Sequence, residues 1–265
     1  MEEIYSRNNP KIKQARALRE RKHRLASGHF IIEGIFHVGA AVEAGAALEA
    51  IFFAPDYLHS DFALGLIEEQ SNRGVPCYTT PSAVFDSLAG KENPQGIIAV
   101  ARQRRDRLDQ LAPQNFPWGV ALVAPQDPGN LGAILRTIDA VGASGLLLLD
   151  ASADPYHPTA VRASMGSIFW HPVVMTSFED FAHWARVNSY HVYGTSAHAS
   201  RDYREIPTYE RPLILLMGSE RQGLTTEQAR VCQELIRLPM HGHVTSLNLA
   251  VAAGVILYTL SEKLG

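Results

Sequence analysis

Polar side chains that could bind a ligand follow an apolar run near the middle of the chain. The run 118–125 is followed by Asn130 and, six residues later, by Arg136. Ligands of open α/β sheets bind at the C-terminal ends of the strands, so residues just after an apolar run are informative. Asn130 stands where a helix N-cap is expected, and Arg136 lies among apolar residues, where its charge needs an anionic or polar partner. A cap and a surface cation are ordinary roles, but together the two residues favour a binding site.

A second group follows the apolar run LILLM, in a loop with a glycine at each end. Gly218 and Gly223 enclose Glu220. The spacing lacks the middle glycine of a dinucleotide-binding loop, and a carboxylate would repel a pyrophosphate held at a helix N-terminus. Glu220 therefore suits a sugar hydroxyl or an arginine better than a phosphate. A glycine-bounded turn with a capping glutamate is the ordinary alternative.

The third group lies near the C-terminus, where Ser246, Leu247 and Asn248 open a long helix rich in small residues. Thr245 and Ser246 are the candidate N-caps of this helix. Small side chains allow backbones to approach closely, which both a packed helix interface and a tight cofactor pocket require. The sequence leaves both uses open.

Other kinds of site find little support. His241 and His243 have no third ligand beside them, so we predict no metal site. The chain lacks the nucleophile elbow of a Ser-His-Asp hydrolase. A nucleotide-dependent oxidoreductase with a doubly wound sheet is a further alternative, and the absence of G-x-G-x-x-G after any apolar run argues against it.

Six apolar runs predict the strands that position these groups. They are WGVALVAP, SGLLLLD, PVVMTS, YHVYGTS, PLILLMG and ELIRLPM. Near-continuous apolar runs separated by helical stretches are typical of a parallel sheet that is covered on both faces. We therefore predict an α/β domain over residues 118–265.

The first part of the chain alternates short strands with helices, beginning with a strand over Phe30–Ile32. This β-α-β rhythm predicts a small α/β domain over residues 1–101. The stretch 102–117 is polar, has weak periodicity and carries Pro113 and Pro117, so we interpret it as a linker.

Charge is segregated along the chain. The formal net charge is −3, yet residues 1–29 hold eight basic side chains against three acidic ones, a local charge of +5. Clustered Lys and Arg are what phosphate contacts require, so this basic segment is compatible with RNA. It is equally compatible with a solvated helix that points four side chains inward at helical spacing. Those four are Ile12, Ala15, Leu18 and Leu25.

Composition excludes several classes of protein. No stretch approaches the roughly 20 apolar residues that span a bilayer, and the N-terminal sequence has no apolar core typical of a signal peptide. Cys77 and Cys232 lie too far apart in sequence for a disulfide framework or a zinc finger. We expect a cytoplasmic protein without membrane segments.

Together, the three groups resemble the signature motifs of the SpoU branch of the SPOUT superfamily, the S-adenosylmethionine-dependent RNA ribose 2′-O-methyltransferases. The matching residues are Asn130, Gly132 and Arg136, then Gly218, Glu220 and Gly223, and finally Pro239, Met240, Gly242, Ser246, Leu247, Asn248 and Ala250. The segment 154–166 is similar to the loop and helix between the first two motifs. Residues 1–100 resemble the ribosomal-protein-like RNA-binding domain that often precedes the catalytic domain.

The resemblance implies a small N-terminal α/β RNA-binding domain followed by a SPOUT α/β domain with a parallel sheet and a C-terminal trefoil knot. It also implies a homodimer through the catalytic domain, with an active site built from both subunits. S-adenosylmethionine would bind in the knot, mostly through backbone groups around Thr195, Gly218, Leu238 and Leu247. The residues nominated for catalysis are Asn130, Arg136, Glu220, Ser246 and Asn248. Those expected to hold RNA phosphates are Arg7, Lys11, Lys13 and Arg162.

Methyl transfer requires a ribose 2′-hydroxyl that is aligned with the methyl donor and loses its proton. Arg136 is a poor base, because a guanidinium is permanently protonated in proteins. We expect Arg136 to bind the target's phosphate and to stabilise the developing alkoxide, while a neighbouring group or water takes the proton.

The sequence does not name the RNA. The additional N-terminal domain favours 23S ribosomal RNA over tRNA, because a structured RNA fragment offers a wider surface to bind. A tRNA 2′-O-methyltransferase and a non-catalytic RNA-binding protein that retains the fold are the alternatives. The presence of Asn130, Arg136, Glu220 and Asn248 argues against the non-catalytic protein.

Overall fold

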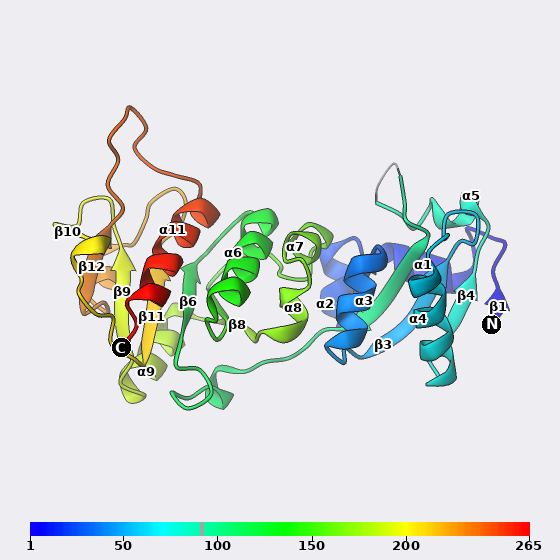
Figure 1. Ribbon diagram of the computed structural model, residues 1–265, viewed down its shortest axis with the longest axis horizontal. Helices are drawn as coiled ribbons and strands as arrows, with labels where there is room; N and C mark the ends of the chain where they lie inside the picture. The colour runs from blue at the N-terminus through cyan, green and yellow to red at the C-terminus, as the bar shows by residue number, and fades with distance from the viewer. Residues whose placement is uncertain (91–92) are drawn as a thin grey trace. The chain divides into compact units, whose positions relative to one another are not determined.

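A computed structural model describes residues 1–90 and 93–265 of the chain (Figure 1). Contacts divide the chain into two compact units. The first unit contains Met1–Arg104 and Tyr156–Phe169, and the second contains Arg105–Pro155 and Trp170–Gly265. The chain therefore passes between the units three times. Among the described helices, none is long and apolar enough to cross a membrane.

The first unit is built on a mixed five-stranded sheet of order β1-β4-β3-β5-β2. Its strands are β1 (Glu2–Glu3), β2 (His29–Glu33), β3 (Leu48–Phe53), β4 (Cys77–Thr79) and β5 (Ile97–Arg102). Its helices are α1 (Pro10–Ala17), α2 (Arg21–Ser27), α3 (Ile35–Glu43), α4 (Asp61–Asn72), α5 (Ser82–Phe85), α7 (Pro158–Ala163) and most of α8 (Ser167–Trp170). Strand β5 runs antiparallel to both β3 and β2, whereas β4 is parallel to β1 and β3. The predicted α/β character of this region is present.

The basic segment forms two short helices, α1 and α2, instead of one. Ile12, Ala15 and Leu18 are buried as predicted, but Leu25 is 63% exposed, so its predicted inward position is wrong. The reason is the break between the helices, which changes the phase of α2. Arg24 becomes the buried residue of α2, and its guanidinium donates hydrogen bonds to the carbonyls of Leu18 (2.8 Å) and Arg19 (2.7 Å). It thereby satisfies carbonyl groups beyond the end of α1.

Helix α7 and the start of α8 pack in the first unit. The domain predicted from sequence over residues 118–265 includes this segment, residues 156–169. The ring of Phe30 on β2 lies 4.7 Å from that of Tyr156 and 6.3 Å from that of Phe169, between centroids. The Nε2 atom of His37 lies 3.2 Å from the carbonyl oxygen of Arg162. These contacts join the segment to β2 and α3.

The second unit contains a seven-stranded sheet of order β10-β12-β9-β11-β6-β7-β8 in which every pairing is parallel. Its strands are β6 (Trp118–Val123), β7 (Leu146–Leu149), β8 (Val173–Thr176), β9 (His191–Thr195), β10 (Arg201–Asp202), β11 (Leu213–Met217) and β12 (Glu234–Arg237). Its helices are α6 (Pro128–Val141), α9 (Phe178–Val187), α10 (Thr226–Ala229), α11 (Leu249–Glu262) and the 3-10 turns Leu108–Gln110 and Tyr203–Glu205. All six predicted strands are confirmed.

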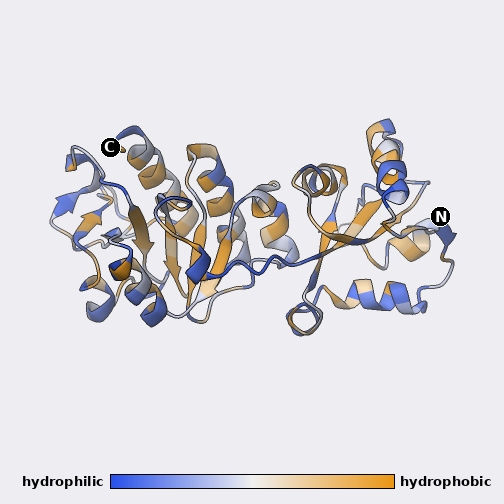
Figure 2. Ribbon diagram, turned by 90° about the horizontal axis from the view of Figure 1, so that it is seen from below, coloured by the Kyte–Doolittle hydropathy of each residue, from blue (hydrophilic) through white to orange (hydrophobic). Residues whose placement is uncertain are grey.

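Helices cover both faces of this sheet, and apolar residues concentrate in its strands (Figure 2). The four leucines of β7 are fully buried, for example, and each buried leucine contributes about 1.5–3 kcal/mol to folding. The predicted parallel sheet with two covered faces is therefore confirmed. Its hydrophobic strands provide a rigid support for the loops that follow them.

The register of the sheet places the carboxyl ends of its central strands at one edge. Leu122 near the end of β6 pairs with Met217 at the end of β11, and Leu216 pairs with Gly194 of β9. The loops after these strands therefore begin side by side, as open α/β sheets require for a ligand site. The chain after β12 forms a long loop that projects from the sheet before α11 begins (Figure 1). Helix α11 then packs against α6.

Candidate active site

Three polar side chains from the three predicted groups form one chain of hydrogen bonds. The Nδ2 atom of Asn248 donates to Oδ1 of Asn130 at 3.0 Å. The Nδ2 atom of Asn130 donates in turn to Oε1 of Glu220 at 2.6 Å. The two ends of this chain are 118 and 90 residues from Asn130 in sequence. The fold thus brings all three groups to one place, as the strand-end argument predicts.

Asn130 is available for this network because another residue caps its helix. Asp127 is the N-cap of α6, and its carboxylate accepts a hydrogen bond from the Gly129 amide at 2.8 Å. Pro128 occupies the first turn, where its missing N–H costs nothing. The ordinary alternative for Asn130, a helix cap, is therefore filled by Asp127. Its side chain, on a residue that is 7% exposed, instead bonds Glu220 and Asn248.

The N-cap of α11 is Asn248, and neither Thr245 nor Ser246 holds that position. Its Oδ1 atom accepts hydrogen bonds from the amides of Ala250 (2.9 Å) and Val251 (3.3 Å). Because Oδ1 is occupied by the cap, the Nδ2 group remains to donate to Asn130. One amide side chain thus starts the helix and joins it to α6.

Replacing Asn248 by alanine should lower the free energy of unfolding by about 1–2 kcal/mol, because both the cap and the bond to Asn130 are lost. Asn248→Ser keeps a capping oxygen but lacks the amide donor, and should recover about half of the loss. Urea unfolding of the three proteins checks this. An alanine variant as stable as the natural protein would show that Asn248 neither caps α11 nor binds Asn130 in solution.

A cavity of about 740 Å³ lies beside this network in the second unit. Its walls include all four residues predicted to bind the cofactor, namely Thr195, Gly218, Leu238 and Leu247. Glu220, Ser246 and Asn248 also line it, whereas Asn130 and Arg136 do not. The volume falls within the range of about 300–1,000 Å³ that is typical of small-molecule sites. The structure thus groups seven of the nine residues predicted for catalysis and cofactor binding around one cavity.

The loop after β11 closes tightly on itself at one wall of the cavity. Ser219 and Gly223 exchange two backbone hydrogen bonds of 3.1 Å and 2.9 Å. A Cβ atom on Gly218 would collide with backbone atoms of Gly223 and Leu224, so only glycine fits there. Gly223 has a φ of +67°, a left-handed conformation that glycine adopts at little cost. These two glycines determine the shape of the loop, but their spacing differs from that of the glycines in a dinucleotide-binding loop.

Arg136 lies on α6 with an exposed side chain. Within residues 1–90 and 93–265 it forms no hydrogen bond or ion pair, so the predicted partner is absent from the chain itself. The apolar neighbours that suggested a need for a partner, Leu131, Ile134, Leu135 and Ile138, are buried on other sides of the helix. The guanidinium is therefore free to meet a group from outside the chain.

The residues predicted to hold RNA lie in the first unit, around α1 and α7. Arg7 donates from Nε to the Ala83 carbonyl at 2.7 Å, and Lys11 forms an ion pair of 2.6 Å with Glu2. The side chain of Lys13 is exposed and has no hydrogen-bond or ion-pair partner in the part of the chain that the structure describes. Arg162 is half-buried on α7. Lys11 and Lys13 thus share α1, Arg7 precedes it, and Arg162 comes from α7 of the same unit.

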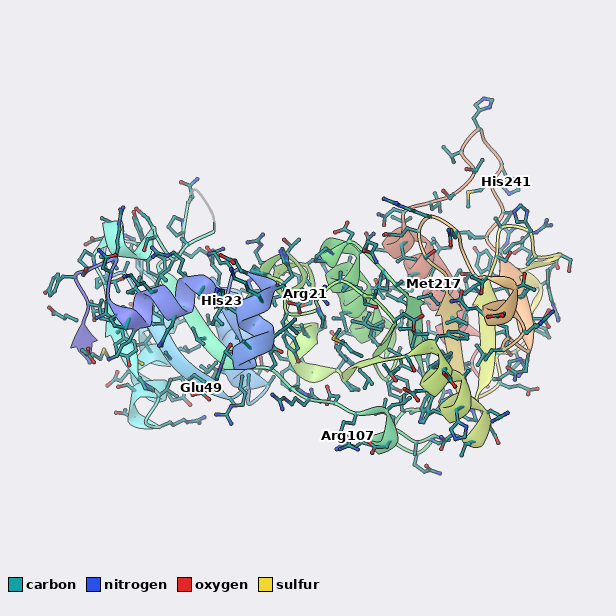
Figure 3. All side chains as sticks on the ribbon, turned by 180° about the vertical axis from the view of Figure 1, so that it is seen from behind. Arg21, His23, Glu49, Arg107, Met217 and His241 are labelled. Atoms are coloured by element: carbon teal, nitrogen blue, oxygen red, sulfur yellow. The ribbon has the colours of Figure 1, made fainter. Side chains whose placement is uncertain are left out.

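Some residues of the site were missed by the sequence reasoning. Ser196 and His198 line the cavity directly after β9, and Met217 lines it at the end of β11 (Figure 3). Ser196 and His198 stand at or just after the end of the apolar run YHVYGTS, the position at which ligand-binding residues of a parallel sheet are expected. Among the described residues, no group of three or more His, Cys, Asp or Glu side chains is placed to hold a metal ion. The absence of a metal stays a prediction.

A parallel α/β sheet with a cavity at the carboxyl ends of its strands defines a class of proteins that bind small molecules at this edge. Within that class, residues 117–258 match the SpoU rRNA Methylase family, and residues 9–99 match the MRM3-like substrate binding domain. The first match covers more than half of the chain. The chain belongs to the SpoU rRNA methylase family.

Relatives match nearly the whole chain. The 23S rRNA (guanosine(2553)-2′-O)-methyltransferase RlmP of Bacillus subtilis is 30% identical over 98% of this chain and 99% of its own length. The 23S rRNA (uridine(2479)-2′-O)-methyltransferase of Streptomyces viridochromogenes is 30% identical over 94% and 88%. The crystal structure of an AdoMet-bound rRNA methyltransferase from Sinorhizobium meliloti is 35% identical, with a TM-score of 0.91 over 98% of this chain and 97% of that one.

Proposed function

We propose that this protein transfers a methyl group from S-adenosylmethionine to a ribose 2′-hydroxyl of ribosomal RNA, with 23S rRNA as the substrate. The observation that carries the proposal is the chain of hydrogen bonds from Asn248 through Asn130 to Glu220, beside the cavity of the second unit. The family, and relatives that methylate 23S rRNA, support the same reaction.

The cavity fits S-adenosylmethionine in size and in the chemistry of its walls. Leu238 and Leu247 provide apolar surfaces for an adenine, and the strand ends at Thr195 and Gly218 provide backbone groups that can read the edge of the base. When bound there, this cofactor supplies a methyl group on a positively charged sulfur. The same cofactor is bound in the structures from S. meliloti and S. viridochromogenes.

The polar residues of the site have separate tasks in this proposal. Glu220 and Asn248 are fixed through Asn130, so they can orient the ribose beside the cavity with little loss of entropy. Ser246 adds a hydroxyl at the cavity wall. Arg136 binds the phosphate of the target nucleotide and stabilises the alkoxide as the 2′-hydroxyl loses its proton to a neighbouring group or water.

The quaternary structure is part of the proposal. Val251, Val255 and Tyr258 form an exposed apolar stripe on α11, with exposed fractions of 53%, 38% and 54%. Exposed apolar patches are typical of protein interfaces. We therefore propose a homodimer through the catalytic domain, with a C-terminal trefoil knot and an active site that both subunits complete. A cytoplasmic location completes the proposal.

The proposed division of labour follows the sequence segments. Residues 1–101 bind the RNA substrate, 102–117 form the linker and 118–265 form the catalytic domain. The match of residues 9–99 to a substrate binding domain supports the first of these roles.

Incubation of total RNA with the protein and S-adenosylmethionine labelled in its methyl group tests the function. The label should enter 23S rRNA, and the phosphodiester bond that follows the methylated ribose should resist alkaline hydrolysis. Reverse transcription at low nucleotide concentration then maps the methylated position. Heat-denatured protein is the control. Label in tRNA would favour the tRNA methyltransferase, and RNA binding without transfer would favour the non-catalytic protein.

Reversing the charge of Arg7, Lys11 and Lys13 to glutamate should weaken rRNA binding by at least about tenfold at low salt and should flatten its salt dependence. Each phosphate contact that is lost removes about one unit from the slope of log affinity against log salt. Fluorescence anisotropy across a salt series checks both quantities. An unchanged slope would show that these cations do not contact the RNA.

A further inference from the structure

The first unit contains a second cavity, of about 860 Å³, on the side of its sheet that faces α1 and α2. Residues of both helices and of the four strands β2, β3, β4 and β5 line it. His23 on α2 and Glu49 on β3 are two of its lining residues (Figure 3). The cavity lies wholly within one unit and includes no residue of the candidate active site.

The floor of this cavity is apolar and partly aromatic. It includes Phe52 and Tyr78, whose ring centroids are 5.1 Å apart, together with Ala50 and Val100. The helical side carries four small residues, Ala15, Ala17, Ala26 and Ser27, of which Ala26 is exposed at the surface of α2. The apolar, partly aromatic floor and the volume of the cavity leave room for a planar group.

Cationic and polar groups surround the apolar floor. Lys11 and Lys13 both line the cavity, and Lys11 places its Nζ atom 4.2 Å from the centre of the Tyr78 ring. Gln14 and Lys13 have no side-chain hydrogen bonds in the described parts of the chain. An amide that can both donate and accept is the kind of group that reads the edge of a nucleobase.

The single acidic residue that lines the cavity, Glu49, is neutralised by its neighbours. Its Oε1 atom accepts hydrogen bonds from Nε (3.1 Å) and Nη2 (2.6 Å) of Arg102, and lies 3.7 Å from Nε2 of His29. Arg102 also holds the pKa of Glu49 below its ordinary value. Lys11 is likewise paired with Glu2, so Lys13 carries the unpaired positive charge at this cavity, in keeping with the +5 balance of residues 1–29.

We propose that this cavity binds one unstacked nucleotide of a single-stranded segment of the RNA substrate. The base packs on the apolar floor beside Tyr78, Gln14 contacts its edge, and Lys13 and Lys11 contact the adjacent phosphates. Aromatic surface combined with cations is how proteins bind single-stranded nucleic acid. The proposal rests on the proposed function only in taking RNA as the substrate. An acidic peptide would also meet the two lysines, but its carboxylates would leave the apolar, aromatic floor without a matching group.

The test uses the full chain and a fluorescein-labelled nine-nucleotide single-stranded oligoribonucleotide of mixed sequence. Ala26→Trp should fill the mouth of the cavity and weaken binding by about tenfold or more, since stacking and packing of one base account for at least that factor. Leu25→Trp is the matched control on the same helix, because Leu25 is exposed and does not line the cavity. It should bind the oligonucleotide as the natural protein does.

Further measurements keep the test decisive. A blunt RNA duplex of the same length should bind Ala26→Trp within about twofold of the natural protein, since its bases are not available to the cavity. Lys13→Gln should reduce the salt slope for the single strand by about 0.7. Thermal unfolding checks that Ala26→Trp folds. Gln14→Leu, at a surface position, is a second variant; it should weaken binding of the single-stranded oligonucleotide but not binding of the duplex.

Cross-linking locates the nucleotide directly. An oligonucleotide with one 4-thiouridine should cross-link to peptides of α1 or β4, and Ala26→Trp should abolish that product. Natural affinity in both Ala26→Trp and Gln14→Leu, cross-links confined to other segments, or binding of polyglutamate in place of RNA would each overturn the proposal. Failure of methyl transfer to rRNA by a protein that still binds the oligonucleotide in the cavity would instead count against the proposed function alone.

Discussion

Replacing Arg136 by lysine should lower kcat for RNA methylation by about 100-fold or more, which is the usual cost of losing one donor to a developing oxyanion. Lysine keeps the positive charge but lacks the planar fork that binds a phosphate through two hydrogen bonds. Arg136 is exposed and makes no hydrogen bond or ion pair within the described residues, so the fold does not depend on it. Thermal unfolding and S-adenosylmethionine affinity should therefore stay unchanged.

Single-turnover methylation of rRNA separates this effect from RNA binding. Arg73→Lys is the matched control, because Arg73 is an exposed arginine whose ion pair is with Glu69 on the surface of the first unit. It should methylate RNA at the natural rate. Near-normal turnover by Arg136→Lys would refute both the phosphate contact and the stabilisation of the alkoxide.

Replacing Gly218 by alanine should abolish methylation and weaken S-adenosylmethionine binding by about 100-fold or more. The new Cβ would collide with backbone atoms of Gly223 and Leu224, and these cannot move aside as the end of a flexible side chain could. The loop at the cavity wall must then open, and the shape of the wall is lost. Calorimetric titration with the cofactor measures the loss of affinity directly.

The same substitution at Gly65 provides the control. Gly65 lies within α4, and a Cβ there meets no atom within 4 Å. Gly65→Ala should leave cofactor affinity unchanged and raise the free energy of unfolding by about 0.5–1 kcal/mol, because alanine favours a helix interior. If Gly218→Ala bound the cofactor normally, the loop after β11 could not be part of the cofactor site.

The sheet of the second unit could be predicted from sequence because buried parallel strands leave a clear signal. Runs such as the four leucines of β7 have no polar position, so their burial on both faces follows from composition alone. The direction of β5 in the first unit could not be predicted, because a short apolar run reads the same for a parallel and an antiparallel strand. Leu25 was misplaced because spacing does not show where one helix ends and another begins.

The site was predicted in its members but not in its details. The order of strand ends correctly suggested that Asn130, Glu220 and Asn248 would meet. The caps could not be assigned from sequence because several capping residues stand close together at the start of each helix. Asp127 is as good a cap of α6 as Asn130, and Asn248 is as good a cap of α11 as Thr245 or Ser246. The apolar neighbours of Arg136 lie on other faces of α6, so its exposed guanidinium needs no partner within the described residues, and its contact with an RNA phosphate stays a prediction.

The packing of residues 156–169 in the first unit limits how this family of chains can be recombined. Tyr156 and Phe169 lie against Phe30, so a hybrid that joined residues 1–104 of one protein to the remainder of another would pair surfaces that never evolved together. The first unit is consequently not exchangeable as one continuous segment of the chain. A chimera that acquires a new first unit has to bring its own version of α7 and the start of α8 with it.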